Sequence, residues 1–116
     1  MKVLIVTATE FEASLLRQRW AGEPRVQVVV TGVGPVNAAH AATVAILNDR
    51  PECILVCGVG GAYPSAGLKI GDVVCAEAEV YGDLGAQSPS GFLDMKALGF
   101  PVVAAAEPIL DRKSTV

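Results

Sequence analysis

The sequence predicts an α/β fold, a three-layer sandwich with a central sheet that is mostly parallel or mixed. Short apolar runs rich in β-branched residues alternate with longer amphipathic segments, in the order strand, helix, strand, helix, strand, strand. This order is typical of layered domains with a largely parallel core. The 116 residues are 52% hydrophobic and 18% charged, a globular composition with enough apolar residues for a core. We find no boundary within the chain and expect residues 1–116 to form a single α/β domain.

The first strand and helix are predicted near the amino terminus. Residues 2–7 (KVLIVT) have the composition of a buried strand. Residues 9–20 predict an amphipathic helix. Thr9 and Glu12 have capping-box spacing, a threonine followed three residues later by a glutamate, so the helix should begin at Thr9. The apolar residues that share one face of this helix are Phe11, Leu15 and Leu16.

A second strand and helix follow. Residues 25–31 (RVQVVVT) predict a strand, and a turn at Gly32–Gly34 leads into a helix over residues 35–49. Pro35 suits the first turn of a helix, where its missing N–H is no loss. We expect His40 to be packed or at the surface rather than catalytic. The predicted inner stripe of this helix is Val36, Ala39, Thr43, Ile46 and Leu47.

The stretch around which the chain is organised is residues 53–72. It opens with a continuous apolar run at residues 53–57, which predicts a strand covered on both faces. Gly58, Val59, Gly60 and Gly61 follow, and their glycines let the backbone turn sharply and approach a ligand closely. Because ligands of open α/β sheets bind beyond the carboxyl ends of strands, we expect a small molecule here. A tight connection without a ligand is the structural alternative.

The remainder of the chain is less regular. Residues 64–71 predict a long turn, and residues 72–81 (DVVCAEAEVY) predict a further strand with one apolar and one partly polar face. Residues 82–91 predict a polar loop, in which Asp83 is an ordinary turn residue or part of a special backbone shape. Residues 101–106 predict a short strand, and residues 111–116 carry no structural signal.

Composition excludes several classes of function. The net charge is -3 and the nine basic residues are scattered, which argues against nucleic acid or an anionic membrane as a partner. The three cysteines lie in apolar runs and are expected to be small buried residues in a reducing compartment. We expect no metal site, because the single histidine and the cysteine spacing supply no ligand set, and no cofactor. The first residues do not form a signal peptide, and we expect the cytoplasm.

Two motifs have competing interpretations. Gly32-Val33-Gly34 between a strand and a helix invites a dinucleotide site, but Asn37 replaces the third glycine and Pro35 removes a helix N–H, so a tight turn serves equally well. Glu12 is either the capping-box partner of Thr9 or a carboxylate placed beyond the first strand to polarise a water and stabilise positive charge. Spacing alone favours the cap.

Three segments together resemble the nucleoside phosphorylase and nucleosidase superfamily. They are KVLIVTATEFE at the start, TGVGPVNAAHAA in the middle, and VCGVGGAYPSAGLKIGDVV. The resemblance as a whole runs from residue 1 to about residue 101. The resemblance implies the phosphorylase/hydrolase-like sandwich fold. Within the superfamily, residues 58–63 and 81–85 look most like the futalosine hydrolase family, whose members release hypoxanthine from futalosine in menaquinone biosynthesis. Methylthioadenosine/S-adenosylhomocysteine nucleosidases usually carry serine where Val59 stands.

The resemblance implies a role for five residues. Glu12 matches the catalytic glutamate that activates the attacking water, and Ala8 matches a position beside the ribose. Val59, Gly60 and Gly61 match the segment that lies along the nucleoside. Such an enzyme acts on a purine nucleoside, without metal or cofactor, and family members commonly form homo-oligomers. Phosphorolysis would call for cations, commonly arginine, and residues 31–35 and 58–69 contain none, so hydrolysis is favoured.

The chain departs from the superfamily in its later part. Members use a second-half glutamate for the ribose hydroxyls and an aspartate that protonates the base, and Asp94 and Asp111 do not stand in matching contexts. The 116 residues therefore look like the amino-terminal part of a longer nucleosidase domain. The alternatives are a methylthioadenosine-type nucleosidase, a purine nucleoside phosphorylase, and an inactive nucleoside-binding or oligomerisation module.

Overall fold

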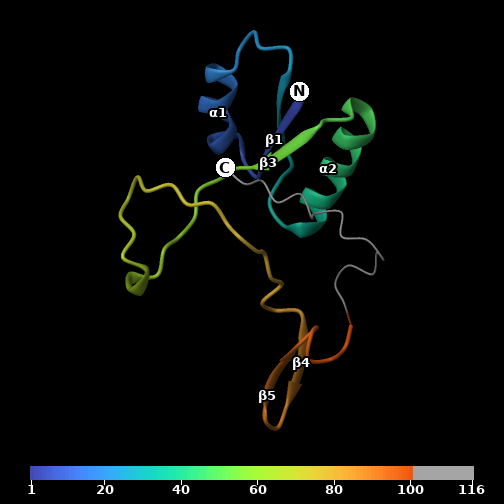
Figure 1. Cartoon of the computed structure of the whole chain (residues 1–116), viewed down its shortest axis with the longest axis vertical. Helices are drawn as coiled ribbons and strands as arrows, with labels where there is room; N and C mark the ends of the chain where they lie inside the picture. The colour runs from blue at the N-terminus through green and yellow to red at the C-terminus, as the bar shows by residue number, and fades with distance from the viewer. Residues whose placement is uncertain (101–116) are drawn as a thin grey trace. The chain divides into compact units, whose positions relative to one another are not determined.

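The computed structural model describes residues 1–100 (Figure 1). Its internal contacts divide the chain into two units, Met1–Ile70 and Gly71–Val116, and each is described by itself. The strand predicted at residues 101–106 and the tail at 111–116 lie outside the described residues. That residues 1–116 form a single domain stays a prediction.

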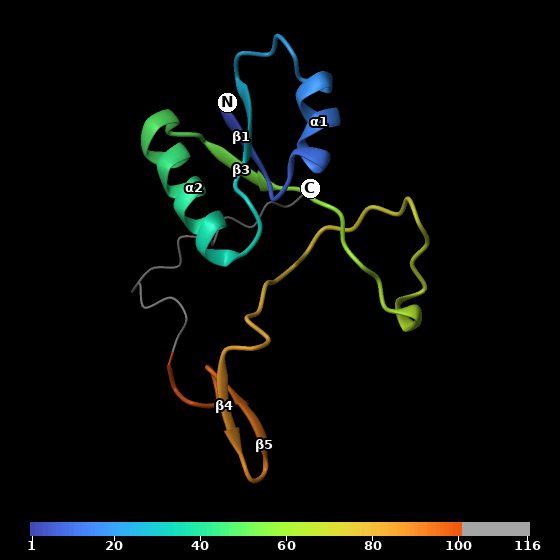
Figure 2. The same ribbon diagram turned by 180° about the vertical axis from the view of Figure 1, so that it is seen from behind.

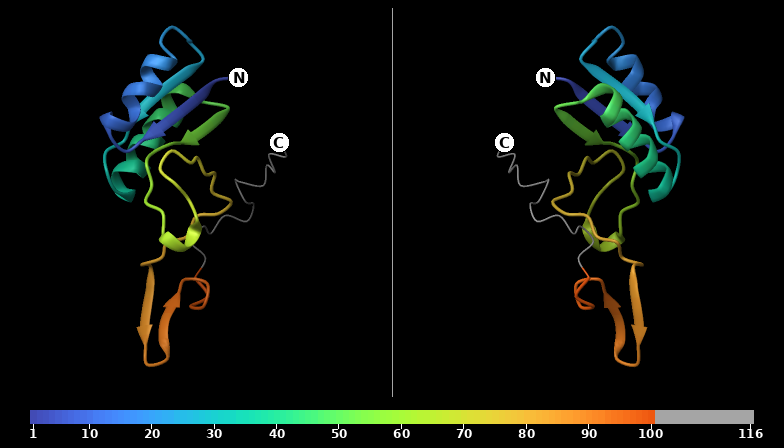
Figure 3. Two further views of the ribbon diagram at one scale, coloured as in Figure 1. Left: turned by 90° about the vertical axis from the view of Figure 1, so that its left-hand side faces the viewer. Right: turned by 90° about the vertical axis from the view of Figure 1, so that its right-hand side faces the viewer.

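The first unit is a parallel sheet with helices, so the predicted α/β class is confirmed. Strand β1 (Val3–Thr7) lies between β2 (Val26–Val30) and β3 (Cys53–Val56), and Val3 is opposite both Val26 and Cys53. The three strands run in the same direction (Figure 3), as strands joined by helical crossovers do. The two helices lie on either side of the sheet (Figure 1 and Figure 2).

Helix α1 (Glu10–Arg19) begins with the predicted capping box. Thr9 is the N-cap: its side chain accepts a hydrogen bond from the N–H of Glu12, and the Glu12 side chain accepts one from the N–H of Thr9. The helix buries Ala13 completely, whereas Phe11 and Leu15 are exposed. The apolar face predicted for α1 is therefore only partly buried in this unit, and the residue of α1 that is fully buried is the small Ala13.

Helix α2 (Pro35–Asp49) has the predicted bounds, but its predicted inner stripe is wrong. Val36 and Leu47 are 81% and 70% exposed, whereas Ala45 is 6% exposed and packs with Leu4, Val6 and Val29. The physical reason is size: alanines let a helix approach a sheet closely, although they contribute little to an apolar pattern weighted by large side chains. The small residues on the covered side of α2 are Ala38, Ala41, Ala42 and Ala45.

Strand β3 is confirmed, but the prediction that it is covered on both faces is wrong for the described residues. Ile54, Leu55 and Val56 are exposed, Val56 by 84%. The order β2-β1-β3 places β3 at an edge of its sheet, so it bonds to a neighbour on one side only. An edge strand with large apolar side chains leaves an apolar surface that other parts of a protein usually cover.

The described part of the second unit differs from the sequence prediction. Residues 72–81 form no strand and are exposed. The segment predicted as a loop at 82–91 instead contains β4 (Gly85–Ser88), which pairs antiparallel with β5 (Gly91–Asp94). The Ser88 hydroxyl donates to the Gly91 carbonyl at 2.7 Å, and Gly91 has a φ of 124°, so turn chemistry closes this hairpin. Its strands lack β-branched residues, which explains why they were missed.

The turn at residues 64–71 and the burial of the cysteines were also predicted from the sequence. The predicted turn at 64–71 contains a short 3-10 helix, η1 (Pro64–Ala66). All three cysteines are free, but Cys75 is exposed and Cys53 and Cys57 are only partly buried, so the prediction that they are buried is wrong for Cys75. Among residues 1–100, no helix has the length and apolar character needed to cross a bilayer.

Candidate active site

The candidate site lies at the carboxyl ends of the parallel strands. Ala8 follows β1, the Gly32–Gly34 turn follows β2, and Gly58 to Gly61 follow β3. A hydrogen bond joins two of these segments, from the Val59 N–H to Oε1 of Glu12 at 3.0 Å, across 47 residues of sequence. The structure therefore brings Glu12 and the Gly58–Val59 segment together at one sheet edge, as the topology rule for α/β folds leads us to expect.

Three donors surround the Glu12 carboxylate. Oε2 accepts from the N–H and from the hydroxyl of Thr9, at 2.9 Å each, and Oε1 accepts from Val59. Hydrogen bonds to the charged form favour ionisation. Accordingly, the Val59 N–H first, then the Thr9 side chain, and to a smaller extent the N–H groups of Thr9 and Ala8, lower the pKa of Glu12. At neutral pH the group is a carboxylate, the form that a general base requires.

The Glu12 carboxylate lies so close to position 58 that it leaves no room for a side chain there. A Cβ placed there would lie 2.8 Å from Oε1 of Glu12, closer than side chains tolerate. Gly60 and Gly61 are different, because a Cβ at either would meet no atom within 4 Å. Val59 is itself exposed. The predicted substrate segment is thus open to solvent, and its contact with a nucleoside stays a prediction.

Ala8 lies at a cavity of about 270 Å³ on the same sheet edge. Glycines at positions 32 and 34 have positive φ of 85° and 98° and shape the turn that lines it. The Asn37 side chain donates to the Val33 carbonyl at 2.8 Å, which closes this turn internally. That geometry explains the glycines as a tight turn and gives no support to a dinucleotide site. The cavity is lined by Val6, Thr7, Ala8, Thr31, Gly32, Gly34, Pro35, Ala38, Ala42, Ile54 and Val56.

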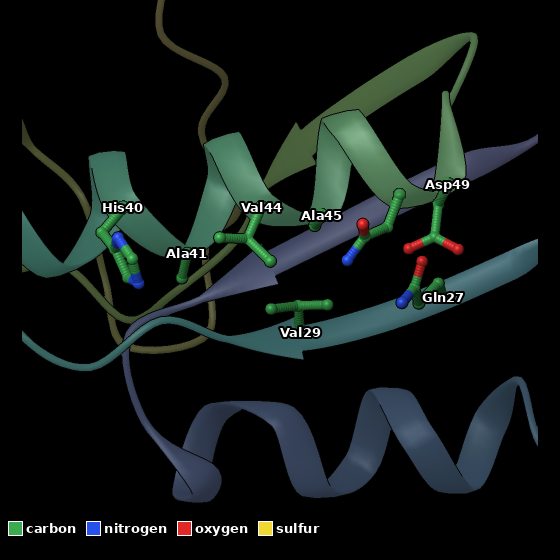
Figure 4. Close-up of a pocket in the computed structure, with 8 residues that line it drawn as sticks. Gln27, Val29, His40, Ala41, Val44, Ala45 and Asp49 are labelled. Carbon is green, nitrogen blue, oxygen red and sulfur yellow. The ribbon is translucent and has the colours of Figure 1, made fainter.

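A second cavity, of about 340 Å³, lies between α2 and β2 (Figure 4). His40 is exposed at one end of it, in keeping with the surface role expected for this residue, and Asp49 lies at the other. The Lys2 ammonium group is 3.6 Å from Oδ1 of Asp49 and donates to its carbonyl at 2.7 Å. His40 and Asp49 lie at opposite ends of the cavity and Asp49 is paired with Lys2, so the described residues that line it form no acid–base pair. Within residues 1–100, no group of three or more histidine, cysteine or acidic side chains could hold a metal.

Sequence reasoning found Glu12 and its capping partner Thr9, but it did not predict the hydrogen bond from Val59. Val59 was expected to lie along a ligand, and its N–H instead binds Glu12 in this structure. Gly58 was expected at the same sheet edge as Glu12, but its close approach to the carboxylate was not predicted. The signal that could have identified it is its place two residues after the end of β3, at the sheet edge where the first turn of α1 lies.

Comparison with known proteins agrees with this architecture. The family model of the phosphorylase superfamily matches residues 12–113. The chain therefore belongs to the phosphorylase superfamily.

Among named relatives, the futalosine hydrolase of Thermus thermophilus is 34% identical over 112 residues, covering 90% of this chain and 47% of that protein. The futalosine hydrolase of Acidothermus cellulolyticus is 38% identical over 119 residues, covering 91% and 48%. A 5'-methylthioadenosine/S-adenosylhomocysteine nucleosidase of an Exiguobacterium species is 32% identical over 91 residues, covering 64% and 39%. The chain spans about half the length of the first two, and no solved structure matches significantly.

Proposed function

We propose that the chain supplies the water-activating part of a nucleosidase that hydrolyses the N-glycosidic bond of futalosine and releases hypoxanthine, in the cytoplasm and in menaquinone biosynthesis. The observation that carries the proposal is the Glu12 carboxylate, held ionised by Thr9 and Val59 beyond the carboxyl end of β1. The similarity to two futalosine hydrolases over nine-tenths of the chain supports this substrate over others.

The chemistry follows from the charges that develop when the bond breaks. The ribose becomes oxocarbenium-like while the purine gains negative charge, so one carboxylate serves the water and the positive charge, and an acid protonates the purine, as in two-carboxylate glycosidases. Glu12 accepts the water proton as the water oxygen bonds to the anomeric carbon. The proton for the purine comes from an acid that we place in the part of the enzyme beyond this chain.

A second candidate is a methylthioadenosine/S-adenosylhomocysteine nucleosidase, which the Exiguobacterium relative favours. A purine nucleoside phosphorylase and a non-catalytic nucleoside-binding module are the remaining alternatives. The proposed state is a homo-oligomer, and the exposed apolar side chains of α2 and β3 supply a surface for association.

The test is the release of free base. A version of the protein that carries the carboxyl-terminal half of its relatives is incubated with futalosine, methylthioadenosine or inosine, each with and without phosphate. We expect hypoxanthine from futalosine at a rate independent of phosphate. Base release that depends on phosphate would establish a phosphorylase, a preference for methylthioadenosine would establish the second candidate, and binding without turnover would support the non-catalytic module.

A further inference from the structure

The two oxygens of the Glu12 carboxylate have different hydrogen-bond partners. An ionised carboxylate has about four lone-pair positions, two on each oxygen. Among the described residues, Oε2 accepts two hydrogen bonds, both from Thr9, and Oε1 accepts one, from Val59. Oε1 therefore accepts fewer of these hydrogen bonds than Oε2, while the Ala8 N–H adds a smaller interaction with the carboxylate, and Oε1 is the oxygen that we assign to a water molecule.

Gly58 lies directly against that oxygen. A Cβ at position 58 would be 2.8 Å from Oε1, whereas ordinary contact begins at 3.4 Å. A Cβ there would require the oxygen, which ends a flexible side chain, to move by about 0.6 Å to reach ordinary contact, and misplacement by about 1 Å can cost ~10²-fold in rate. The absence of a side chain at this position is thus a geometric requirement of the carboxylate in its present place.

We infer that Thr9 and Gly58 are positioning residues for the base: Thr9 occupies Oε2, and Gly58 leaves Oε1 free to accept the proton of the attacking water. The inference rests on the proposed function. In the step, the water oxygen bonds to the anomeric carbon, the electrons of the C–N bond go to the purine, and the water proton goes to Oε1. Neither positioning residue touches the reacting atoms, and both act through Glu12.

Hydrogen bonds rather than charges control the carboxylate. On α1, the acid closest in sequence is Glu10, and it is paired with Arg17. Strand β1 carries no titratable group, and the only one in residues 57–61 is Cys57. Because Val59 and Thr9 provide the largest effects on the pKa of Glu12, losing either contact should raise that pKa.

The positioning is tested without activity, by ¹³C NMR titration of the Glu12 carboxyl group in the 116-residue chain, with the resonance assigned from Glu12→Gln. Thr9→Val removes the hydroxyl and should raise the titration midpoint, while Thr9→Ser should retain the parental value. The matched control is Ser14→Ala, because the Ser14 hydroxyl on the same helix donates to the Phe11 carbonyl and not to Glu12. Gly58→Ala should raise the midpoint and shift the Val59 amide resonance, and the control Gly82→Ala, where a Cβ meets nothing within 4 Å, should do neither.

The consequence for catalysis is measured in the version that carries the carboxyl-terminal half. Gly58→Ala should lower kcat by about 10- to 100-fold and change KM by less than about threefold, since the base is displaced while the nucleoside contacts remain. Thr9→Val should move the acidic limb of the kcat/KM profile to higher pH, and Thr9→Ser should restore it.

Unchanged midpoints in both Thr9→Val and Gly58→Ala, with helical circular dichroism retained, would overturn the inference. If Thr9→Val lost the helical circular dichroism, the test would use Thr9→Ser instead. A raised titration midpoint in Thr9→Ser, which keeps a hydroxyl, would count against the role of the hydroxyl. A parent that released no base from any nucleoside would refute the proposed function while leaving the titration result to judge the positioning.

Discussion

Replacing Glu12 by glutamine tests the proposed base most directly, and the structure says what the change removes. An amide has one acceptor oxygen and one donor group, whereas the carboxylate uses both oxygens as acceptors. If the amide oxygen takes the Oε1 position, the amide NH₂ group faces the Thr9 N–H. If the amide oxygen takes the Oε2 position, the NH₂ group faces the Val59 N–H. Either orientation leaves one backbone donor without its acceptor, so the side chain loses both its proton-accepting capacity and part of its fixed position.

The expected loss of turnover follows from the first of these effects. General-base catalysis typically contributes ~10²–10⁴-fold, so Glu12→Gln should lower kcat by at least about 100-fold. Binding of the nucleoside, measured by isothermal titration in the same protein, should change far less. The assay is release of hypoxanthine from futalosine under saturating conditions, in the version that carries the carboxyl-terminal half.

The matched control is Glu10→Gln, in the first turn of the same helix. The Glu10 carboxylate pairs with Arg17, and within residues 1–100 it makes no hydrogen bond or ion pair with residues 57–61. Its replacement should leave turnover within about twofold of the parent, because surface ion pairs contribute little. Turnover of Glu12→Gln within a factor of two of the parent would refute the assignment of the base, and an equal loss in both variants would show that the effect comes from the helix rather than from the chemistry.

Three further predictions concern the fold and are checked by urea unfolding. Because Ala45 is buried and Leu47 is exposed, Ala45→Leu should destabilise the chain by about 1–3 kcal/mol and Leu47→Ala by about 0.5 kcal/mol or less; the reverse order would restore the predicted inner stripe. Arg50 ends α2 with a φ of 46°, so Arg50→Gly should stabilise by about 1 kcal/mol, and a loss of stability would show that the arginine side chain is needed there. Since the folded-state pKa of Glu12 is lowered, its stabilising contribution is fully present above the ordinary glutamate pKa of about 4.3 and is lost as the pH falls through the lowered value. The difference in unfolding free energy between the parent and Glu12→Gln should therefore shrink on acidification, and a difference that grew toward low pH would contradict the pKa direction.

The sequence predicted the regular elements of the first unit because local signals fix them. Proline in the first turn and Arg50-Pro51 at the end set the bounds of α2, and the spacing of Thr9 and Glu12 marked the start of α1. The sheet edge at which Glu12 meets the glycine segment also followed from topology, since parallel strands bring their carboxyl ends together. These inferences needed no knowledge of side-chain packing.

Packing is what the sequence failed to predict. The covered face of α2 is made of alanines, and an apolar pattern is dominated by larger residues such as Val36 and Leu47, which are exposed. The strand expected at residues 72–81 has the right alternation, but a strand forms only with a partner for its N–H and C=O groups, and alternation does not specify that partner. The hairpin of β4 and β5 arose where turn chemistry, not strand propensity, decides.

The structure also bears on whether Glu12 is only a helix cap. A capping box requires one carboxylate oxygen to accept from the N-cap N–H, and Oε2 does so. The cap explains neither the Val59 N–H on Oε1 nor the glycine at position 58, where a Cβ would lie 2.8 Å from that oxygen. Those two features come from a segment 47 residues away, and that segment takes no part in capping the helix. A capping box accepts glutamate or glutamine at this position, so the ionised form that the base requires is compatible with the cap. The cap therefore does not compete with the base: it holds Oε2, and Oε1 is the oxygen that we assign to the water.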